Sequence, residues 1–469
     1  ENNYIEGVGV VIFAQEGGTS PMLEDIVIRR NTIETLPRYR FHPQNPSSDG
    51  RYYAHRQQFE LKRGRRVLVE GNQFIGNFTD IAYPGPTWNL SSRGQTGITN
   101  QIADVDFNSN IVYQSSGGLQ VTGLDGSEYN DAMLTARIRA RNNLMYEVNG
   151  RRCSAFTTAL NCKDPSQVRG FQLMVAQGVS DFIAENNTFW DFRGSGPAVL
   201  ILGGRRGVRS VIRKNIFSLN LDSGQGGVIF SGDLNSFLPA PAVTQAADKI
   251  WSEWFFSDGA PDPASRFENN VIVPGVRDTS NPAAYSSTST TLNLTRHACE
   301  NGTGTGGFAG LLGSGNSCAG LNAANNGTET AAARFASLGF KSLVPGQEDF
   351  TLEETSPFAV KLAEGTRDDP GVRMNDLLAA IGRVMNPMLT GSGRTATLTY
   401  STMDAQACAI DFGTLASGAA IPGRGTRRFE AAFPGSHSVT LSGLLPSTQY
   451  AAWLLCPGGQ YYFSWRTGF

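Results

Sequence analysis

Apolar and polar positions recur in one pattern along the first 270 residues of the chain. Each copy has an apolar or small residue, two variable positions, an asparagine, one variable position and a second apolar residue, as in Ile28-Arg29-Arg30-Asn31-Thr32-Ile33. The pattern is centred on Asn31, Asn72, Asn110, Asn143, Asn187, Asn215 and Asn270, and Asn3 begins a shortened further copy. An internal repeat of this length decides the architecture, because each copy is one structural unit that stacks on its neighbours.

The hydrophobic period inside each copy is that of strands. Apolar residues alternate before the asparagine, as at Val67 and Val69, and a glycine with a second apolar run, such as Leu119 to Val121, follows most copies. Two or three short strands and a turn predict one coil of a parallel β-helix, which the crossover rule makes right-handed. Asparagines stacked in that turn would hydrogen-bond from coil to coil. The spacing between them varies from 28 to 55 residues, so insertions leave the coils as loops.

These patterns predict an all-β protein in two parts. Residues 1–385 form a right-handed parallel β-helix, and residues 395–469 form a small β-sandwich. Within the solenoid, 276–335 is predicted to be a long loop excursion and 349–385 a capping segment, whose helical stretch 374–385 is expected to lie across the last coil. Pro387, Gly391 and Gly393 indicate a linker at 386–394. Because the sequence opens inside a coil, we expect further coils to precede it, or another chain to pair with the first coil.

The six cysteines fall into local pairs, and the last pair lies in the predicted sandwich. Cys153 with Cys162, Cys299 with Cys318 and Cys408 with Cys456 predict up to three disulfides and an oxidising, extracellular compartment. Six reduced, buried thiols are the alternative. Leu441 to Tyr450 resembles the fibronectin type III signature, in which the tyrosine hydroxyl bonds back to the preceding loop. The resemblance implies a spacer or a weak adhesive unit.

Several stretches of the predicted solenoid have a familiar sequence: Glu1 to Gly7, Asp25 to Asn31, Phe59 to Lys62, Arg66 to Asn72, Asp349 to Leu352 and Arg367 to Val372. Together they resemble a family of secreted bacterial right-handed parallel β-helix proteins common in soil organisms. In that family further coils usually precede the first one seen here. The family supplies no activity, and the analogy of fold to pectate and alginate lyases or polygalacturonases points only to carbohydrate.

The charge balance, the length of the apolar runs and the motifs that are missing make several classes of function improbable. The chain carries 39 basic and 41 acidic residues, a net charge of -2, which supplies no overall field for nucleic acid. No apolar run approaches the ~20 residues of a membrane-spanning helix, so no membrane insertion is expected. Phosphate-binding loops, dinucleotide fingerprints and serine-nucleophile elbows are not found in a fitting context.

Aligning the coils on their asparagines places Glu70, Asp106, Arg139 and Arg141 in one exposed cluster. This mixture suits a polysaccharide lyase, in which a base removes the proton beside a uronate carboxylate and a cation neutralises the developing enolate. All four are candidate catalytic residues: Asp106 and Glu70 could hold Ca²⁺, and Arg139 or Arg141 could act as the base or as the neutralising cation. A salt-bridge ladder that keeps the coils in register is the alternative, and the more frequent one.

Two loop insertions are expected near this cluster. Their aromatic and basic residues would form a groove for an acidic glycan, by stacking on sugar rings and pairing with carboxylates, or would pack the loops onto the flank of the solenoid. These residues are His42, Tyr52, Tyr53, His55, Arg56, Tyr83, Trp88 and Arg93.

The sequence therefore predicts a secreted β-helix protein that binds an acidic extracellular polysaccharide or cell-surface glycan and is a candidate lyase or glycoside hydrolase. A non-catalytic adhesin or structural surface protein is the alternative.

Overall fold

The computed structural model describes most strands of the chain and their connections. The described residues are 3–7, 10–14, 22–35, 57–77, 86–93, 101–125, 135–149, 171–176, 178–190, 192–193, 199–202, 209–218, 228–231, 256–257, 260–261, 264–273, 291–293, 317–318, 338–343, 348–362, 366–381, 384–392, 394–406, 408–417, 425–430, 433–456 and 459–468.

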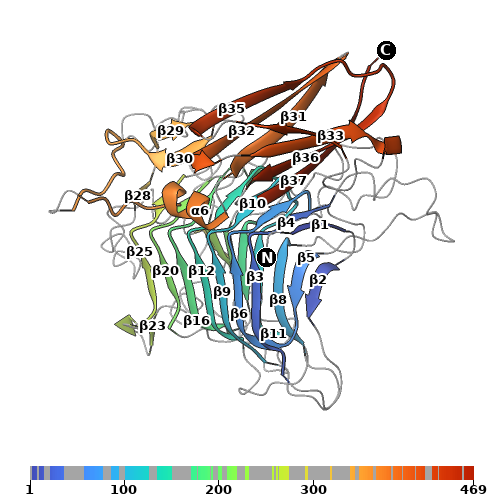
Figure 1. The fold of residues 1–469 in the computed structure, drawn as a ribbon. Coiled ribbons are helices and arrows are strands. Elements are labelled where there is room, and N and C mark those ends of the chain that lie inside the picture. The colour runs from blue at the N-terminus through green and yellow to red at the C-terminus, as the bar shows by residue number, and fades with distance from the viewer. Residues whose placement is uncertain are drawn as a thin grey trace.

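The repeat folds into coils that build three long sheets, as the sequence predicts (Figure 1). The chain passes from a strand of sheet C, through the asparagine turn, to a strand of sheet A and then to one of sheet B. Sheet A contains β1 (Tyr4–Glu6), β4 (Thr32–Glu34), β7 (Gln73–Ile75), β10 (Ile111–Tyr113), β13 (Leu144–Tyr146), β17 (Thr188–Phe189), β21 (Ile216–Phe217), β26 (Val271–Ile272) and β28 (Ser317–Cys318). Sheet B contains β2 (Val10–Ala14), β5 (Gln57–Leu61), β8 (Trp88–Arg93), β11 (Leu119–Asp125), β15 (Leu173–Ala176), β19 (Val199–Leu202), β22 (Val228–Ser231) and β27 (Thr291–Asn293). Sheet C contains β3 (Glu24–Arg29), β6 (Gly64–Glu70), β9 (Ile102–Asn108), β12 (Ala136–Arg141), β16 (Ser180–Glu185), β20 (Val211–Arg213) and β25 (Arg266–Glu268).

All strand pairs in sheets A and C are parallel, and in sheet B only the pairing of β27 with β22 is antiparallel. The protein is thus an all-β parallel β-helix with a C-terminal sandwich. Strands β27 and β28 come from the stretch 276–335, predicted to be a loop excursion. Since each joins an edge of a long sheet, these parts of the stretch extend the solenoid.

The asparagines of the repeat form the predicted ladder at the turn between sheets C and A. Oδ1 of each asparagine accepts hydrogen bonds from the main-chain N and from Nδ2 of the asparagine one coil earlier; between Asn143 and Asn187 both distances are 3.0 Å. The same pair of bonds joins every step of the ladder, from Asn3 through Asn31, Asn72, Asn110, Asn143, Asn187 and Asn215 to Asn270. From Asn31 to Asn270, the residue before each asparagine of the ladder adopts a left-handed conformation, as Asn142 does with φ 54°. The turn favours asparagine because its short side chain carries both an acceptor, Oδ1, and a donor, Nδ2, which reach the neighbouring coils.

The core lies inside the coils and is built from columns of inward side chains. Phe59, Trp88 and Leu119 are successive members of one column in sheet B and are fully or almost fully buried. The indole of Trp88 stacks on the ring of Phe107 from sheet C, with centroids 4.6 Å apart.

Residues 366–381, here called the return segment, run back along the turns from the later coils toward the first. Lys214 pairs with Asp368 at 2.6 Å, Arg373 N donates to Asn142 Oδ1 at 2.6 Å, and Arg30 Nε donates to the carbonyl of Ala380 at 3.2 Å. Its helix α6 (Met374–Ile381) covers the first part of the helical stretch predicted over 374–385, whereas Val384 and Met385 belong to a strand. The predicted position across the last coil is wrong, because α6 packs beside the early coils. There Gly71, with φ +66°, leaves room for the Ala380 carbonyl where a side chain would collide with it.

A hairpin of β29 (Phe340–Ser342) and β30 (Asp349–Leu352) covers another part of sheet A. Phe340 and Phe350 pack against Trp190, and these rings join the buried side chains of α6 in one cluster. The hairpin and α6 together therefore cover apolar residues of sheet A on its outer side.

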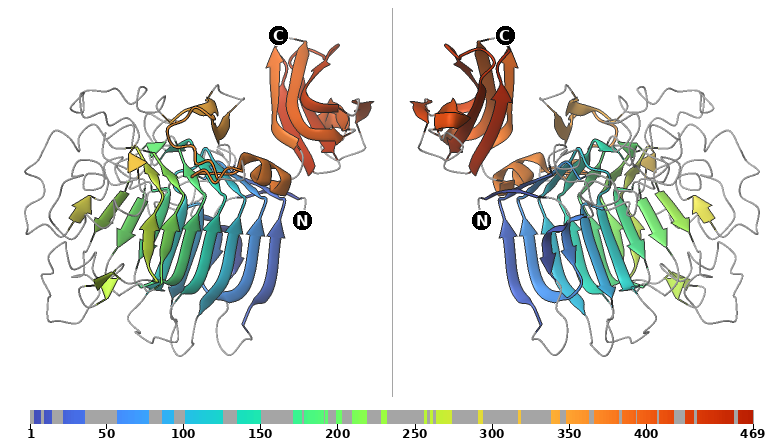
Figure 2. Two further views of the ribbon diagram at one scale, coloured as in Figure 1. Left: turned by 90° about the vertical axis from the view of Figure 1, so that its left-hand side faces the viewer. Right: turned by 90° about the vertical axis from the view of Figure 1, so that its right-hand side faces the viewer.

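The return segment delivers the chain to the sandwich, which lies beside the first coils (Figure 2). One sheet contains β31 (Val384–Ser392), β32 (Thr395–Gln406) and β35 (Phe433–Leu441); the other contains β34 (Thr426–Phe429), β33 (Ala409–Thr414), β36 (Gln449–Cys456) and β37 (Gly459–Arg466). The predicted linker at 386–394 is mostly strand β31, so the sandwich begins earlier than the glycines indicated.

Two predictions for the sandwich are confirmed. Leu445 N donates to the hydroxyl of Tyr450 at 2.9 Å, which is the tyrosine corner expected from the fibronectin-like signature. Cys408, immediately before β33, forms a disulfide with Cys456 at the end of the paired strand β36. Cys153, Cys162 and Cys299 lie outside the described residues, as does the side chain of Cys318.

Candidate functional site: the charged face of sheet C

The candidate catalytic residues lie on β6, β9 and β12, which are neighbouring strands of sheet C (Figure 1). Register pairs Arg139 with Asp106 in the preceding strand, and Arg141 with Asn108. Glu70 in turn pairs with Asn108. These alignments confirm that counting from the asparagines identifies which residues of neighbouring coils stand side by side on the outer face.

Six residues before the asparagines from Asn31 to Asn215, charge alternates from coil to coil, and each arginine forms short hydrogen bonds with the aspartate one coil earlier. This column contains Asp25, Arg66, Asp104, Arg137, Asp181 and Arg209. Arg137 donates from Nε and Nη2 to the two carboxylate oxygens of Asp104 at 2.5 and 2.9 Å, and Arg209 holds Asp181 in the same way at 2.5 and 2.7 Å. The hydrogen bonds from Arg137 lower the pKa of Asp104. This column is a register ladder, since each guanidinium is used up by the carboxylate beside it.

Two residues before the asparagines, a second column is also largely closed. Arg29 pairs with Glu70 at 2.6 Å, and the side-chain amide of Asn108 donates to the other oxygen of Glu70 at 2.8 Å. Further along, Arg213 pairs with Glu185 at 2.7 Å. Both oxygens of Glu70 are therefore engaged in hydrogen bonds, which leaves it poorly placed to act as a base.

Asp106, Arg139 and Arg141 differ from these ladders because their contacts are long. Arg139 and Asp106 approach to 3.7 Å and expose 48% and 40% of their side chains. Arg141 lies 3.6 Å from Glu185, whose shorter partner is Arg213. Nε of Arg141 is buried and has no hydrogen-bond partner among the described residues. Arg139 and Arg141 expose 48% and 42% of their side chains, so the exposed part of each guanidinium group is available to a ligand that carries carboxylates, although Nε of Arg141 itself is not.

The structure divides the predicted cluster. Asp106, Arg139 and Arg141 stand together, whereas Glu70 is held by Arg29 and Asn108. Glu70 and Arg141 nevertheless line one cleft of about 410 Å³ between sheet C and the return segment, together with Arg373 and Asp376. Sequence reasoning did not find those two residues, because nothing in the local pattern places α6 beside coils more than 200 residues earlier.

Most of the predicted groove residues lie outside the described part of the chain. These are His42, Tyr52, Tyr53, His55, Arg56 and Tyr83, and of Arg93 only the main chain, at the end of β8, is described. The prediction for Trp88 is wrong: its side chain is fully buried in the core, in register with Phe59 and Leu119. The alternation Trp88-Asn89-Leu90 is the sequence signal that marks this stretch as a strand with its tryptophan inward.

The described residues contain no group of three or more His, Cys, Asp and Glu side chains that could hold a metal ion. The candidate Ca²⁺ ligands Asp106 and Glu70 are not joined by a third such group there. Among the described helices, none is long and apolar enough to cross a membrane.

No family model and no curated protein sequence matches the chain. The stacked parallel sheets are those of a parallel β-helix. A fold of this kind does not by itself imply a function, which depends on the chemistry of the site.

Proposed function

We propose that this is an extracellular protein that binds an acidic polysaccharide on the outer face of sheet C. The observation that carries the proposal is the contrast between closed and open ion pairs. Arg137 binds Asp104 through two short hydrogen bonds, while Arg139 and Arg141 reach carboxylates only at 3.6 to 3.7 Å. If the ion pairs on this face only kept the coils in register, we would expect Arg139 and Arg141 to bind carboxylates at the short distance seen for Arg137.

The spacing of the open arginines suits a repeating anion. Alternate residues along a strand lie about 6.6 Å apart, so the two guanidinium groups present a short row of donors to successive carboxylates. Their half-exposed side chains avoid most of the cost of desolvation. The disulfide of the sandwich supports an oxidising compartment, where such glycans occur.

Cleavage of the bound glycan is the second candidate function, and Asp106 is the group that favours it. Its carboxylate faces Arg139 at 3.7 Å, with no closer partner among the described residues. In a lyase reaction Asp106 would take the proton beside the uronate carboxylate, while Arg139 or Arg141 would neutralise the enolate charge. The enolate would then expel the glycosidic oxygen on the adjacent carbon, which leaves a C=C bond in the product, and this oxygen would take a proton from water or from the protonated Asp106. A non-catalytic adhesin would use the same arginines for binding alone.

The test separates binding from cleavage. The protein is incubated with a panel of uronate polysaccharides, with and without Ca²⁺, and assayed for binding, for the absorbance of unsaturated products and for new reducing ends. We expect the double variant Arg139→Ala/Arg141→Ala to lose binding by about 10-fold or more, since each charge-assisted hydrogen bond is worth about 1.5–3 kcal/mol.

Arg137→Ala is the matched control, because it removes an arginine from the same strand that is already held by Asp104. It should leave glycan binding unchanged. Equal binding by the wild type and the double variant would overturn the proposal. Product formation that Asp106→Asn abolishes would establish the lyase, and binding without any product would favour the adhesin.

A further inference from the structure

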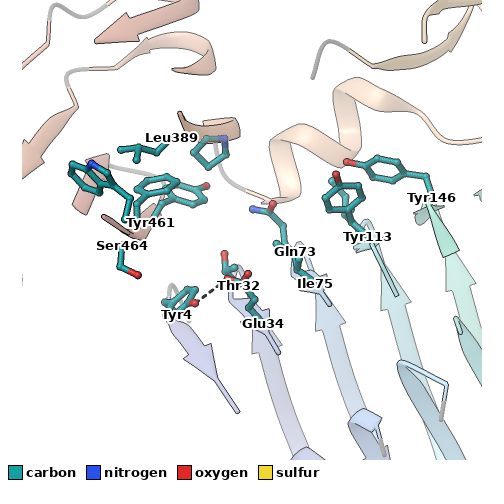
Figure 3. A pocket seen from close by; sticks show the side chains of 14 residues that line it. Tyr4, Thr32, Glu34, Gln73, Ile75, Tyr113, Tyr146, Leu389, Tyr461 and Ser464 are labelled. Carbon is teal, nitrogen blue, oxygen red and sulfur yellow. Dashed lines mark hydrogen bonds between the residues drawn. The ribbon is translucent and has the colours of Figure 1, made fainter. Parts of the chain in front are cut away.

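A second cleft, of about 370 Å³, lies between the outer face of sheet A and the sandwich (Figure 3). Its floor comes from five successive coils and its roof from β31 and β37. The floor residues are Tyr4, Thr32, Glu34, Gln73, Ile75, Ile111, Tyr113 and Tyr146, and the roof residues are Pro387, Leu389, Tyr461, Phe463, Ser464 and Trp465. A volume of this size falls within the usual range of small-ligand sites.

The two walls of the cleft are joined by a specific contact. Gln73 of the floor hydrogen-bonds the phenol of Tyr461 in the roof, and burial raises the pKa of Tyr461 well above its usual range. Figure 3 shows Gln73 pointing toward the roof residues from its strand. The cleft is therefore already formed before a ligand binds, because residues of its floor and roof hold one another in place.

Aromatic rings supply apolar faces on both sides of the cleft. Tyr113 stacks on Tyr146 of the next coil, with centroids 4.5 Å apart. In the roof, Trp465 stacks on Tyr450, with centroids 5.5 Å apart. A second ring supports each of these rings and limits its motion, so little conformational entropy would be lost when a ligand packs against it.

The polar groups of the cleft are almost all uncharged. Thr32, Gln73 and Ser464 offer hydroxyl and amide groups, and the carboxylate of Glu34 accepts a hydrogen bond from the Tyr4 hydroxyl at 2.9 Å. Among the described residues that line the cleft, Glu34 is the one with a carboxylic acid, and there is no lysine or arginine. A uronate would be repelled by Glu34 and would find no cation, whereas a neutral sugar presents hydroxyls to these groups and an apolar ring face to the aromatics.

We propose that this cleft binds a short neutral oligosaccharide, as a site separate from the charged face of sheet C. Coils spaced about 4.8 Å apart make a floor of five strands roughly 19 Å long, which holds several pyranose rings in a row. The solenoid and the sandwich each supply one wall, so the sandwich is part of the binding site as well as a spacer. The proposal does not depend on the proposed role of Arg139 and Arg141.

The test is calorimetric titration of the whole chain with cellotetraose, mannotetraose, maltotetraose and galactotetraose, and with tetragalacturonic acid as the acidic probe. We expect one of the neutral tetrasaccharides to bind with a stoichiometry of one. Tyr113→Ala should raise the dissociation constant of this tetrasaccharide about tenfold, which is the loss expected when a good aromatic contact is removed. Tyr113→Phe keeps the ring, and its dissociation constant should lie within about twofold of that of the wild type. Glu34→Gln should weaken binding measurably without altering the shape of the floor.

Phe429→Ala is the control, since Phe429 is a 74% exposed aromatic on β34, at the opposite edge of the sheet that contains β37. It should bind as the wild type does. The proposal is overturned if none of the neutral probes binds, or if Tyr113→Ala and Glu34→Gln both bind them unchanged. The proposal is also overturned if tetragalacturonic acid binds more tightly than the neutral tetrasaccharides and the double variant Arg139→Ala/Arg141→Ala binds it with the same affinity as the wild type. Should Tyr113→Ala not fold, Glu34→Gln decides the outcome alone.

Discussion

The amide of Asn110 and the carbonyl oxygen of the Asn143 side chain form a two-point contact between coils: Oδ1 of Asn143 accepts from N and Nδ2 of Asn110 at 2.9 and 3.1 Å. Both residues are fully buried. The contact therefore satisfies main-chain and side-chain donors at a depth where water cannot replace them, and it recurs at each step of the ladder.

Asn143→Ala should lower the free energy of unfolding by about 3 kcal/mol, because it leaves the buried main-chain N–H of Asn110 without an acceptor and removes further hydrogen bonds. Chemical denaturation followed by circular dichroism measures the change. Asn375→Ala, at an exposed position of α6, is the control and should change stability by less than about 0.5 kcal/mol. Equal losses for both variants would contradict the stabilising role of the ladder.

The Asp104–Arg137 pair predicts a loss of stability in acid. The pKa of Asp104 is lowered chiefly by hydrogen bonds from Arg137. Because the folded pKa lies below the unfolded value of about 3.9, this stabilisation is present above about pH 4 and is lost as the pH falls through the folded pKa. Arg137→Gln should therefore flatten the dependence of stability on pH below about pH 4. Unfolding curves at several acidic pH values test this, with Glu354→Gln, an exposed residue outside the ladder, as control.

Gly71→Ala should detach or strain α6. Gly71 combines a φ of +66° with a close approach of the Ala380 carbonyl, so alanine meets both a conformational cost and a collision. We expect a loss of about 3 kcal/mol. Gly443→Ala separates the two effects, because Gly443 has φ +73° but nothing within 4 Å of an added Cβ, and it should cost about 1 kcal/mol. If both variants lose the same free energy of unfolding, the added methyl group at residue 71 displaces α6 at no measurable cost, which contradicts the prediction.

The disulfide should stabilise the sandwich and leave the solenoid unaffected. Cys408 and Cys456 are 48 residues apart, and closing a loop of that length is worth about 4 kcal/mol in the chain-entropy model. Cys408→Ala/Cys456→Ala should lower the melting temperature of the sandwich, as seen by calorimetry. The transition of the solenoid should not move. A loss shared by both transitions would instead mean that the two parts unfold as one unit.

Much of the solenoid could be predicted from the sequence, because its coils are built from local patterns. Alternation at Val67 and Val69, and asparagine in the turn, identify the strands and the register of sheet C without any long-range information. The same counting placed Arg139 beside Asp106. The local sequence does not by itself show that Trp88 is a core residue, because its short apolar stretch directly follows a loop insertion. An aromatic residue beside a loop has the same local pattern whether it binds a ligand or is buried.

The fold class, the ladder of asparagines, the residues that share the outer face of sheet C and the pairing of Cys408 with Cys456 all follow from the amino-acid sequence, because strand alternation and turn chemistry act over a few residues. Which ion pairs are short follows from the three-dimensional structure, since it depends on side-chain geometry between coils. The three-dimensional structure alone brought Arg373 to the cleft beside Arg141 and Tyr461 to Gln73, because the return segment docks through contacts between residues more than 200 positions apart.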